Sequence, residues 1–329
     1  MKKQISTLFL ILIILSTANA QLFSILGGQR VGTSSAAFLK IAVGARAEGM
    51  GGAFVGVADD PSCLYWNPAG AAQLKSDAVL FNHIEWPADI KYEYIGIVHH
   101  IGRWGTLGFS AISLHMDDME ETSEYFPSGT GNYFTFGDFA AAISWSLKMT
   151  DNFSFGITGR YLQEDLAGLT MRGGMLDLGT YYKTGFRDMT FAVTLANFGP
   201  DMRPGGSYMN PVEGGDEIET KYQAFPPPTV FRLGSAISVY RNLTTRWLVS
   251  IQLNHPVDNA ENIALGSELQ TLKFLFIRGG YKVNYDEEVY SFGAGLEIPF
   301  KTYTLTVDYA YSDFGLLGDS QRFSLSFWL

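Results

Sequence analysis

The sequence predicts an all-β fold, namely a transmembrane antiparallel up-and-down β-barrel of about 14 strands with an N-terminal plug, or hatch. Three observations predict this fold. After residue 75, apolar residues alternate with small or polar ones in many short runs. Short connections between these runs alternate with long ones. The chain also ends on such a run, whose apolar face continues to the last residue: Phe323, Leu325, Phe327 and Leu329.

The N-terminus predicts export. Two lysines precede an apolar run at residues 8–15, and the small residues at 18–20 are typical of a cleavage site. This pattern indicates a secretory signal peptide, because the apolar run is too short to span a membrane. We therefore predict a signal peptide at residues 1–20, a plug or hatch at 21–75, and a barrel at 76–329.

The predicted plug is richest in glycine between residues 46 and 70. Gly49, Gly51 and Gly52 remove side chains where the backbone must come very close to another part of the chain. Turn or helix-start signals follow at residues 59–62 and again at 67–70. One helix is expected here, either near residues 51–57 or in the turn after Pro68.

Charged residues predict how the plug is held. Arg46 is expected to pair with Asp59 or Asp60, which would fix the hatch. Several further charges fall on predicted lumen faces: Arg160, Asp177, Lys183, Arg232, Glu268, Arg278, Lys282, Glu297 and Asp308. Mixed signs inside a narrow barrel most simply neutralise one another and hold the plug. An ion path is the alternative interpretation.

The strands are predicted from the alternation of apolar residues with small or polar ones, which has a period of two residues. In residues 302–311, tyrosine, leucine and valine alternate with threonine, aspartate and alanine. The apolar face suits lipid and the small or polar face suits a lumen, whereas a soluble sandwich would carry more Lys and Glu on its polar face. Strand-like runs begin near Asp77, Lys91, Thr106, Tyr133, Asn152, Arg172, Met189, Thr229, Thr245, Asn262, Lys273, Val289, Thr302 and Gln321.

Connection lengths predict the orientation in the membrane. Short connections fall at 99–105, 150–151, 185–188, 241–243, 271–272 and 299–301, and longer ones at 85–90, 116–131, 165–171, 199–228, 255–261 and 312–320. Short periplasmic turns and long outer loops are typical of outer-membrane barrels, although the outer connection 285–287 is short. An even strand count then puts the plug on the periplasmic side, where the last strand ends.

Two long connections stand out. Residues 199–228 are expected to be functional or mobile, because a connection of this length shows no obvious structure. The segment at 116–125 carries five acidic residues and no basic one, and we interpret it as a solvated loop tip rather than a cation or partner site.

Composition excludes several functions. The net charge of −10 argues against nucleic acid as a partner, and the single cysteine, Cys63, allows no disulfide framework and is interpreted as a small buried filler. No motif for a cofactor, a phosphate or a catalytic nucleophile is present, so we predict a protein that is not an enzyme. His99 and His100 are adjacent on a strand and point to opposite faces, which argues against a metal pair.

The N-terminal fifth of the chain resembles the PorV/PorQ family of outer-membrane proteins, which is similar in turn to the FadL-type transporters. The resemblance is carried by residues 38–41, by 44–46 and 58–60, and by a plug motif: Arg46, Gly49, Met50, Gly51, Gly52, Asp59, Asp60, Trp66, Asn67, Pro68 and Gly70. The last strand resembles the signal read by the outer-membrane assembly machinery, although that signal usually ends in an aromatic residue: Phe323, Leu325, Phe327, Trp328 and Leu329.

The resemblance implies an outer-membrane location in contact with lipid and two alternative functions. PorV-like proteins act in type IX secretion, where they receive exported cargo and pass it to other secretion-system components. FadL-like proteins admit hydrophobic molecules past a plug and release them sideways into the membrane, which needs an apolar channel and a gap or kink in a strand. The secretion role is the favoured expectation, uptake of a hydrophobic ligand is the alternative, and a plain structural barrel is a third.

Overall fold

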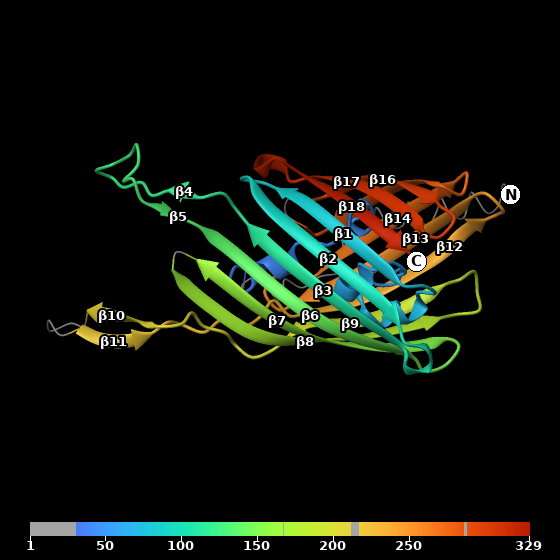
Figure 1. Ribbon diagram of the computed structural model, residues 1–329, viewed down its shortest axis with the longest axis horizontal. Coiled ribbons are helices and arrows are strands. Elements are labelled where there is room, and N and C mark those ends of the chain that lie inside the picture. Colours follow the sequence, from blue (N-terminus) through green and yellow to red (C-terminus); the bar gives the residue numbers. More distant parts are fainter. Residues whose placement is uncertain (1–30, 167, 212–216, 286–287) are drawn as a thin grey trace, which may run out of the picture.

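The computed structural model describes residues 31–166, 168–211, 217–285 and 288–329. Fourteen antiparallel strands close into one barrel (Figure 1). The predicted signal peptide at 1–20 and the start of the predicted plug lie outside the described residues. The barrel strands are β1 (Ala78–Trp86), β2 (Ile90–His100), β3 (Thr106–His115), β6 (Phe136–Lys148), β7 (Phe153–Leu166), β8 (Leu169–Lys183), β9 (Thr190–Phe198), β12 (Val230–Arg241), β13 (Arg246–Pro256), β14 (Asn262–Thr271), β15 (Leu275–Val283), β16 (Tyr290–Pro299), β17 (Thr304–Asp313) and β18 (Asp319–Trp328).

The last strand closes the barrel on the first. Ala78 of β1 lies opposite Trp328 of β18, and Glu85 lies opposite Gln321. Each barrel strand is therefore paired on both sides, which removes the free edge that would invite aggregation. The predicted strand count is confirmed, and the predicted starts lie within three residues of the observed ones.

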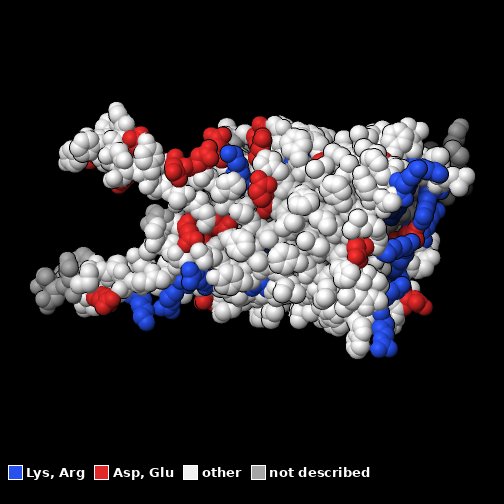
Figure 2. Space-filling model, in the orientation of Figure 1, with Lys and Arg blue, Asp and Glu red and all other residues white. Residues whose placement is uncertain are grey.

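The two faces of the sheet differ as the alternation predicts. Thr190, Ala192 and Thr194 of β9 are buried inside the barrel, whereas Phe191 between them is exposed on the outside. Large apolar side chains are exposed around the outer wall, among them Phe81, Phe109, Ile143, Tyr161, Leu233, Ile251, Ile277, Phe292 and Leu325. On the face shown in Figure 2 the charged residues gather toward the two ends and leave the middle largely uncharged. An apolar belt between two charged rims suits a bilayer.

The two ends of the barrel are unequal. The short turns and the C-terminal residue lie at one end, and two hairpins project from the other (Figure 1). These hairpins are β4 (Met119–Glu120) with β5 (Tyr133–Phe134), and β10 (Ser207–Pro211) with β11 (Glu217–Lys221). The loop at 199–228 thus contains a paired hairpin, which its sequence did not reveal. By the usual rule the short-turn end is periplasmic and the hairpin end is outside.

Short helical turns make up the segment before the barrel: η2 (Ala37–Lys40), α2 (Ala45–Gly49), α3 (Cys63–Trp66) and η3 (Pro68–Gln73). Two others, η4 (Gly102–Trp104) and η5 (Gly315–Leu317), lie in connections between strands. The helix expected at 51–57 is wrong, because Gly51 and Gly52 adopt φ of 65° and 73° and end α2. The helical turn after Pro68 is present, and the Asn67 side chain caps it by accepting the Ala69 N–H at 3.1 Å. No described helix has the length and apolar character needed to cross a membrane.

Candidate functional site

The N-terminal segment fills the inside of the barrel. Near its start, the backbone N–H of Ser35 donates to Pro226 O at 2.9 Å, in the long connection at the hairpin end. Farther along, η3 packs on β6, β7 and β8, close to where β1 begins at the short-turn end. The segment therefore runs through the interior from one end to the other. The segment is thus present at both ends of the barrel rather than at one end only, and which end is periplasmic stays a prediction.

Glycines allow the plug backbone to touch the wall backbone. A Cβ atom added to Gly280 of β15 would lie 2.0 Å from the nitrogen of Gly51, and one added to Gly49 would lie 3.0 Å from Gly293 Cα of β16. The sequence pointed to the plug half of each contact and missed the wall half. The signal was present, since glycine inside a strand often marks close approach of another backbone.

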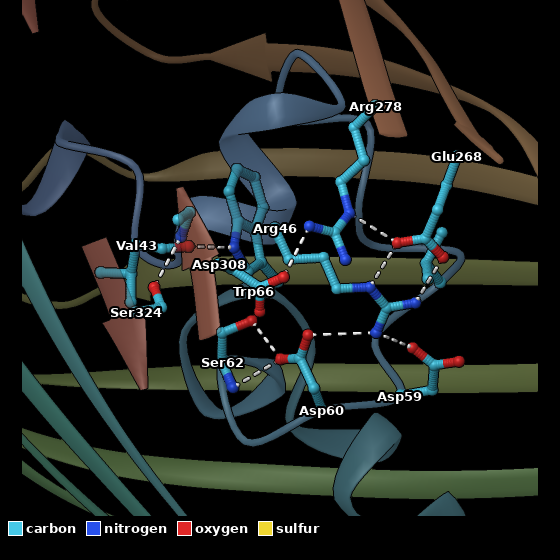
Figure 3. Close-up of polar contacts among 12 residues, drawn as sticks. Val43, Arg46, Asp59, Asp60, Ser62, Trp66, Glu268, Arg278, Asp308 and Ser324 are labelled. Carbon is cyan, nitrogen blue, oxygen red and sulfur yellow. Dashed lines mark hydrogen bonds and ion pairs between the residues drawn. The ribbon is translucent and has the colours of Figure 1, made fainter. Parts of the chain in front are cut away.

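A network of ion pairs joins the plug to the wall (Figure 3). The Arg46 guanidinium lies 2.7 Å from Asp59 Oδ1 and 3.2 Å from Asp60 Oδ2, and it donates to both carboxylate oxygens of Glu268 on β14, at 2.8 and 2.9 Å. Burial alone would lower the pKa of Arg46, but the surrounding carboxylates hold that pKa well above its usual value. The predicted pairing within the plug is present. The anchor on Glu268 was not anticipated.

The same network continues along the wall. Glu268 also accepts from Arg278 Nε at 2.7 Å, and Arg278 Nη1 donates to Asp308 of β17 at 2.6 Å. All three side chains are buried. Forked arginine–carboxylate contacts of this kind fix geometry as well as charge. The network therefore links the plug to three strands through saturated contacts.

Other motif residues stabilise the plug internally. Trp66 Nε1 donates to Val43 O at 2.9 Å, and Asn67 Nδ2 donates to Thr180 O of β8 at 3.1 Å. Met50 is fully buried, and a side chain on Gly70 would collide with Ala58 O at 2.2 Å. These contacts explain the residue types of the motif as packing requirements.

A second charged cluster lies nearer the hairpin end. Lys282 Nζ lies 3.1 Å from Glu48 Oε1 and 2.5 Å from Glu288 Oε2, and Arg322 Nη1 lies 3.7 and 3.8 Å from the same two carboxylates. Burial raises the pKa of Glu288 to about 7, helped by the neighbouring Glu48 carboxylate. Burial would also raise the pKa of Glu48, but Arg322 and Lys282 hold it below its usual value. Arg322 was missed as a lumen residue, although it falls on the polar face of the last predicted strand.

Above the plug, toward the hairpin end, lies a cavity of about 590 Å³, here called the outer cavity. Its apolar lining includes Phe38, Leu39, Ile41, Trp86, Ile90, Leu114, Phe136 and Phe314. Polar side chains line it as well, and five buried atoms among them have no hydrogen-bond partner in the described structure: Asp138 Oδ1, Arg232 Nη1, Glu288 Oε1, Arg322 Nε and Arg322 Nη2. Buried polar atoms normally have partners, so these orphans mark where a ligand or water would bind.

Comparison with known proteins identifies the family. A family model matches residues 14–195, which is more than half of the chain. The chain belongs to the Uncharacterised protein family (UPF0164). This family assignment is compatible with the resemblance to the PorV/PorQ family, but the family model does not name PorV or PorQ. A search of curated proteins gives no match to the UPF0164 chain.

Solved structures similar to the UPF0164 chain share its fold. They include a FadL homologue of Pseudomonas aeruginosa, with 13% identity, a TM-score of 0.51, and coverage of 85% of this chain and 96% of that one. The toluene transporter TodX of Pseudomonas putida is 12% identical, with a TM-score of 0.55 and coverage of 87% of this chain and 97% of that one. The toluene transporter TbuX of Ralstonia pickettii is 11% identical, with a TM-score of 0.52 and coverage of 87% of this chain and 97% of that one. The UPF0164 chain is thus a FadL-like barrel located in the outer membrane.

A groove of about 890 Å³ crosses the outside of the UPF0164 barrel and is here called the wall groove. Phe109, Ile143, Tyr161, Leu176 and Phe198 stand along it, and small residues form its floor: Ala141, Gly159 and Gly174. The pairing of β8 with β9 shifts register between Leu176 and Leu178, and Asn197 adopts φ of 58° there. The pairing of β8 with β9 is therefore irregular at this groove.

Polar residues separate the wall groove from the outer cavity. Asn197 lines the outer cavity, Arg160 lines the wall groove, and Arg160 Nη1 donates to Asn197 Oδ1 at 2.5 Å. Asp177 holds both, because it accepts from Arg160 Nη2 at 2.7 Å and from the Asn197 N–H at 2.6 Å. Sequence reasoning placed Arg160 and Asp177 in the lumen and missed Asn197, whose left-handed backbone suits asparagine.

The other predicted lumen charges divide into two groups. Arg232, Glu268, Arg278, Lys282 and Asp308 are buried inside the barrel, and Glu297 is half-buried. The prediction that Lys183 faces the lumen is wrong, because this residue is exposed at the short-turn end and pairs with Asp188 at 3.5 Å. It is the last residue of β8, where the strand leaves the barrel wall.

The remaining candidate residues have ordinary partners. His99 Nδ1 lies 2.6 Å from Asp77 Oδ2, and His100 Nδ1 lies 3.1 Å from Thr106 Oγ1. Within the described ranges no three His, Cys, Asp or Glu side chains are grouped to hold a metal ion. Cys63 is buried, as predicted, and burial raises the pKa of its thiol well above the usual value. In the predicted assembly signal, Phe323 and Leu325 face outward from β18.

Proposed function

We propose that this UPF0164 protein is a non-enzymatic passage for hydrophobic small molecules, which enter the outer cavity and leave sideways through the wall groove. One observation carries the proposal. An apolar-lined cavity inside the barrel and an apolar groove on its outer wall are separated by the Arg160–Asn197 contact, at a break in strand register.

The size and lining of the outer cavity support this role. Small-molecule pockets are typically about 300–1,000 Å³ and mostly apolar, with a few polar groups that fix orientation. A buried aromatic ligand removes roughly 150–250 Å² of apolar surface from water, which is worth about 4–6 kcal/mol. That gain is enough to draw a sparingly soluble compound from water into the barrel.

The position of the plug supports a lateral exit, because it blocks the straight route through the barrel. The plug fills the barrel below the outer cavity and is tied to the wall by the Arg46–Glu268 contacts. The wall groove opens instead on the lipid side, where an apolar molecule is as well solvated as inside the cavity. A sideways route therefore requires the contacts among Arg160, Asn197 and Asp177 to part, whereas a straight route requires the plug to move.

The route is tested by filling the wall groove from outside. Gly159 has open space around its added Cβ, so Gly159→Phe is expected to place a ring in the groove without disturbing the fold. The matched control is Gly279→Phe, because Gly279 is also a strand glycine with open space around its added Cβ, on β15 outside the groove. Uptake of a labelled monoaromatic hydrocarbon would be measured in cells that express each variant.

We expect Gly159→Phe to lower the uptake rate about tenfold and Gly279→Phe to leave it near the wild-type rate. Equal rates for the two variants would overturn the lateral route. Wild-type cells that take up the hydrocarbon no faster than cells without the protein would overturn the function itself.

A second candidate function is binding of exported cargo in type IX secretion, as the PorV/PorQ resemblance implies. The projecting β4–β5 loop favours it, because it carries exposed aromatic side chains on Tyr125, Phe126 and Tyr133. Aromatic residues in water are typical of protein-binding surfaces. Deleting residues 118–134 is expected to abolish cargo co-purification and to leave hydrocarbon uptake unchanged. Capture of cargo at wild-type levels by the deletion variant would contradict this role.

A further inference from the structure

Two carboxylates lie side by side on one wall of the outer cavity. Asp138 of β6 and Glu164 of β7 are directly opposite in the strand register, and both line the cavity. Side chains at directly opposed positions start from Cβ atoms roughly 4.5–5.5 Å apart, so like charges there repel each other. Such a pair needs a positive partner or a proton.

The described structure supplies no such partner. No Lys, Arg or His nitrogen lies within ion-pair distance of either carboxylate in the parts of the chain that are described. Asp138 is 4% exposed, and its Oδ1 atom has no hydrogen-bond partner there. Glu164 is partly satisfied, because its Oε2 accepts the backbone N–H of Ala36 at 3.0 Å.

None of the described basic residues that line the outer cavity pairs with Asp138 or Glu164, although Arg232 Nη1, Arg322 Nε and Arg322 Nη2 have no hydrogen-bond partner. Lys40 pairs with Asp258, and Lys282 pairs with Glu48 and Glu288. Arg232, on β12, lies over the rings of Tyr65 and Trp66 at 5.5 and 5.3 Å. Two strands, β8 and β9, separate it in the barrel order from the strand of Glu164. The cavity thus has an acidic wall that its own basic residues do not neutralise.

The surroundings of the acidic pair are apolar. Leu114 of β3 lies opposite Asp138 in the register, and Phe136, Phe38 and Trp86 also line the cavity. A charged ligand group here would need an apolar body to fill the remaining space. Aromatic faces add a further attraction for a cation.

We propose that the outer cavity binds hydrophobic amines, with the protonated ammonium group held by Asp138 and Glu164. The ammonium N–H groups would donate to Asp138 Oδ1 and to a Glu164 oxygen, while the apolar part lies against the aromatic side chains. This inference rests on the proposed uptake of hydrophobic small molecules and names the class that the site prefers.

The test compares three probes with the same aromatic body: 2-phenylethylammonium, 2-phenylethanol and 3-phenylpropanoate. Binding to the full-length protein in detergent would be measured by titration calorimetry. The variants are Asp138→Asn and Glu164→Gln, and the matched control is Glu297→Gln, an inward-facing, half-buried carboxylate that does not line the cavity. Asp138→Asn removes a like-charge contact, so this variant is expected to fold.

We expect the ammonium probe to bind about tenfold more tightly than the alcohol, and the carboxylate probe to bind most weakly. Asp138→Asn should remove that tenfold preference, leave the affinity for the alcohol unchanged, and differ from Glu297→Gln, which should keep the preference. An alcohol that binds as tightly as the ammonium probe would overturn the inference and leave the uptake function standing. Failure of both probes to bind would overturn both proposals.

A metal ion is the competing occupant. Calcium chloride would therefore be titrated against the bound ammonium probe. Displacement of the probe by calcium at lower concentration than by a second amine would show a metal site and overturn the inference.

Discussion

The two halves of the barrel interior treat polar groups in opposite ways. In the half next to the short turns, Arg46, Glu268 and Arg278 make close, saturated ion pairs, and the plug backbone touches the wall backbone. In the half next to the hairpins, the outer cavity leaves Asp138 Oδ1 and Arg232 Nη1 without partners. The first arrangement closes the barrel, because opening it would break these ion pairs and backbone contacts and would form no new ones. The second leaves interactions for a ligand to complete.

Each half therefore predicts a different response to mutation. Changes in the sealed half should loosen the plug and lower stability. Changes in the outer half should alter ligand preference or pH response with a smaller effect on stability.

The largest effect is expected from Glu268→Gln. This change leaves Arg46 and Arg278 without their shared carboxylate in a buried setting, and breaking a buried pair in this way typically costs about 3–5 kcal/mol. We expect a lower melting temperature in detergent and faster proteolysis of the plug, with Glu297→Gln as the control that stays near wild type. A melting temperature equal to that of the control would show that the two halves do not differ in this respect.

Gly280→Ala tests the backbone contact in the same half. The new methyl group would lie 2.0 Å from Gly51 nitrogen, so either the plug or β15 must shift, at a cost of about 3 kcal/mol. Gly279→Ala is the control, because the neighbouring position has nothing within 4 Å. We expect small-ion leakage through reconstituted barrels to rise only in Gly280→Ala. Equal leakage in both variants would contradict a tight seal.

In the outer half, Glu288 predicts a pH dependence. Its folded pKa of about 7 lies above the usual value of 4.5, so the stability linked to this group is present below about pH 4.5 and is lost as pH rises toward 7. The loss is on the order of 3 kcal/mol, because the folded and usual pKa values differ by about 2.5 and each whole pKa unit is worth about 1.4 kcal/mol. Glu288→Gln should flatten the melting temperature between pH 5 and 8, and an unchanged slope would contradict the assignment.

The wall was easier to predict from the sequence than the interior. A period of two fixes which residues of a strand share a face, so Phe191 and Thr190 were assigned correctly from their neighbours alone. The partners of Arg46 include Glu268, which lies 222 residues away, and no local pattern connects the two. Asn197 was missed for a related reason, since a register break depends on how two strands pair rather than on either strand.

The smallest effect separates the two acidic partners of Arg46 inside the plug. Asp60 is buried and also accepts from the Ser62 N–H at 2.9 Å, whereas the Asp59 side chain is 37% exposed. Asp60→Ala should cost about 1–2 kcal/mol because it leaves buried donors unpaired, and Asp59→Ala less than about 1 kcal/mol because water replaces the lost contact. Limited proteolysis would measure the difference. Asp60→Ala with the protease resistance of wild type would show that Asp59 and Glu268 hold Arg46 without Asp60, and the seal would then not depend on this buried carboxylate.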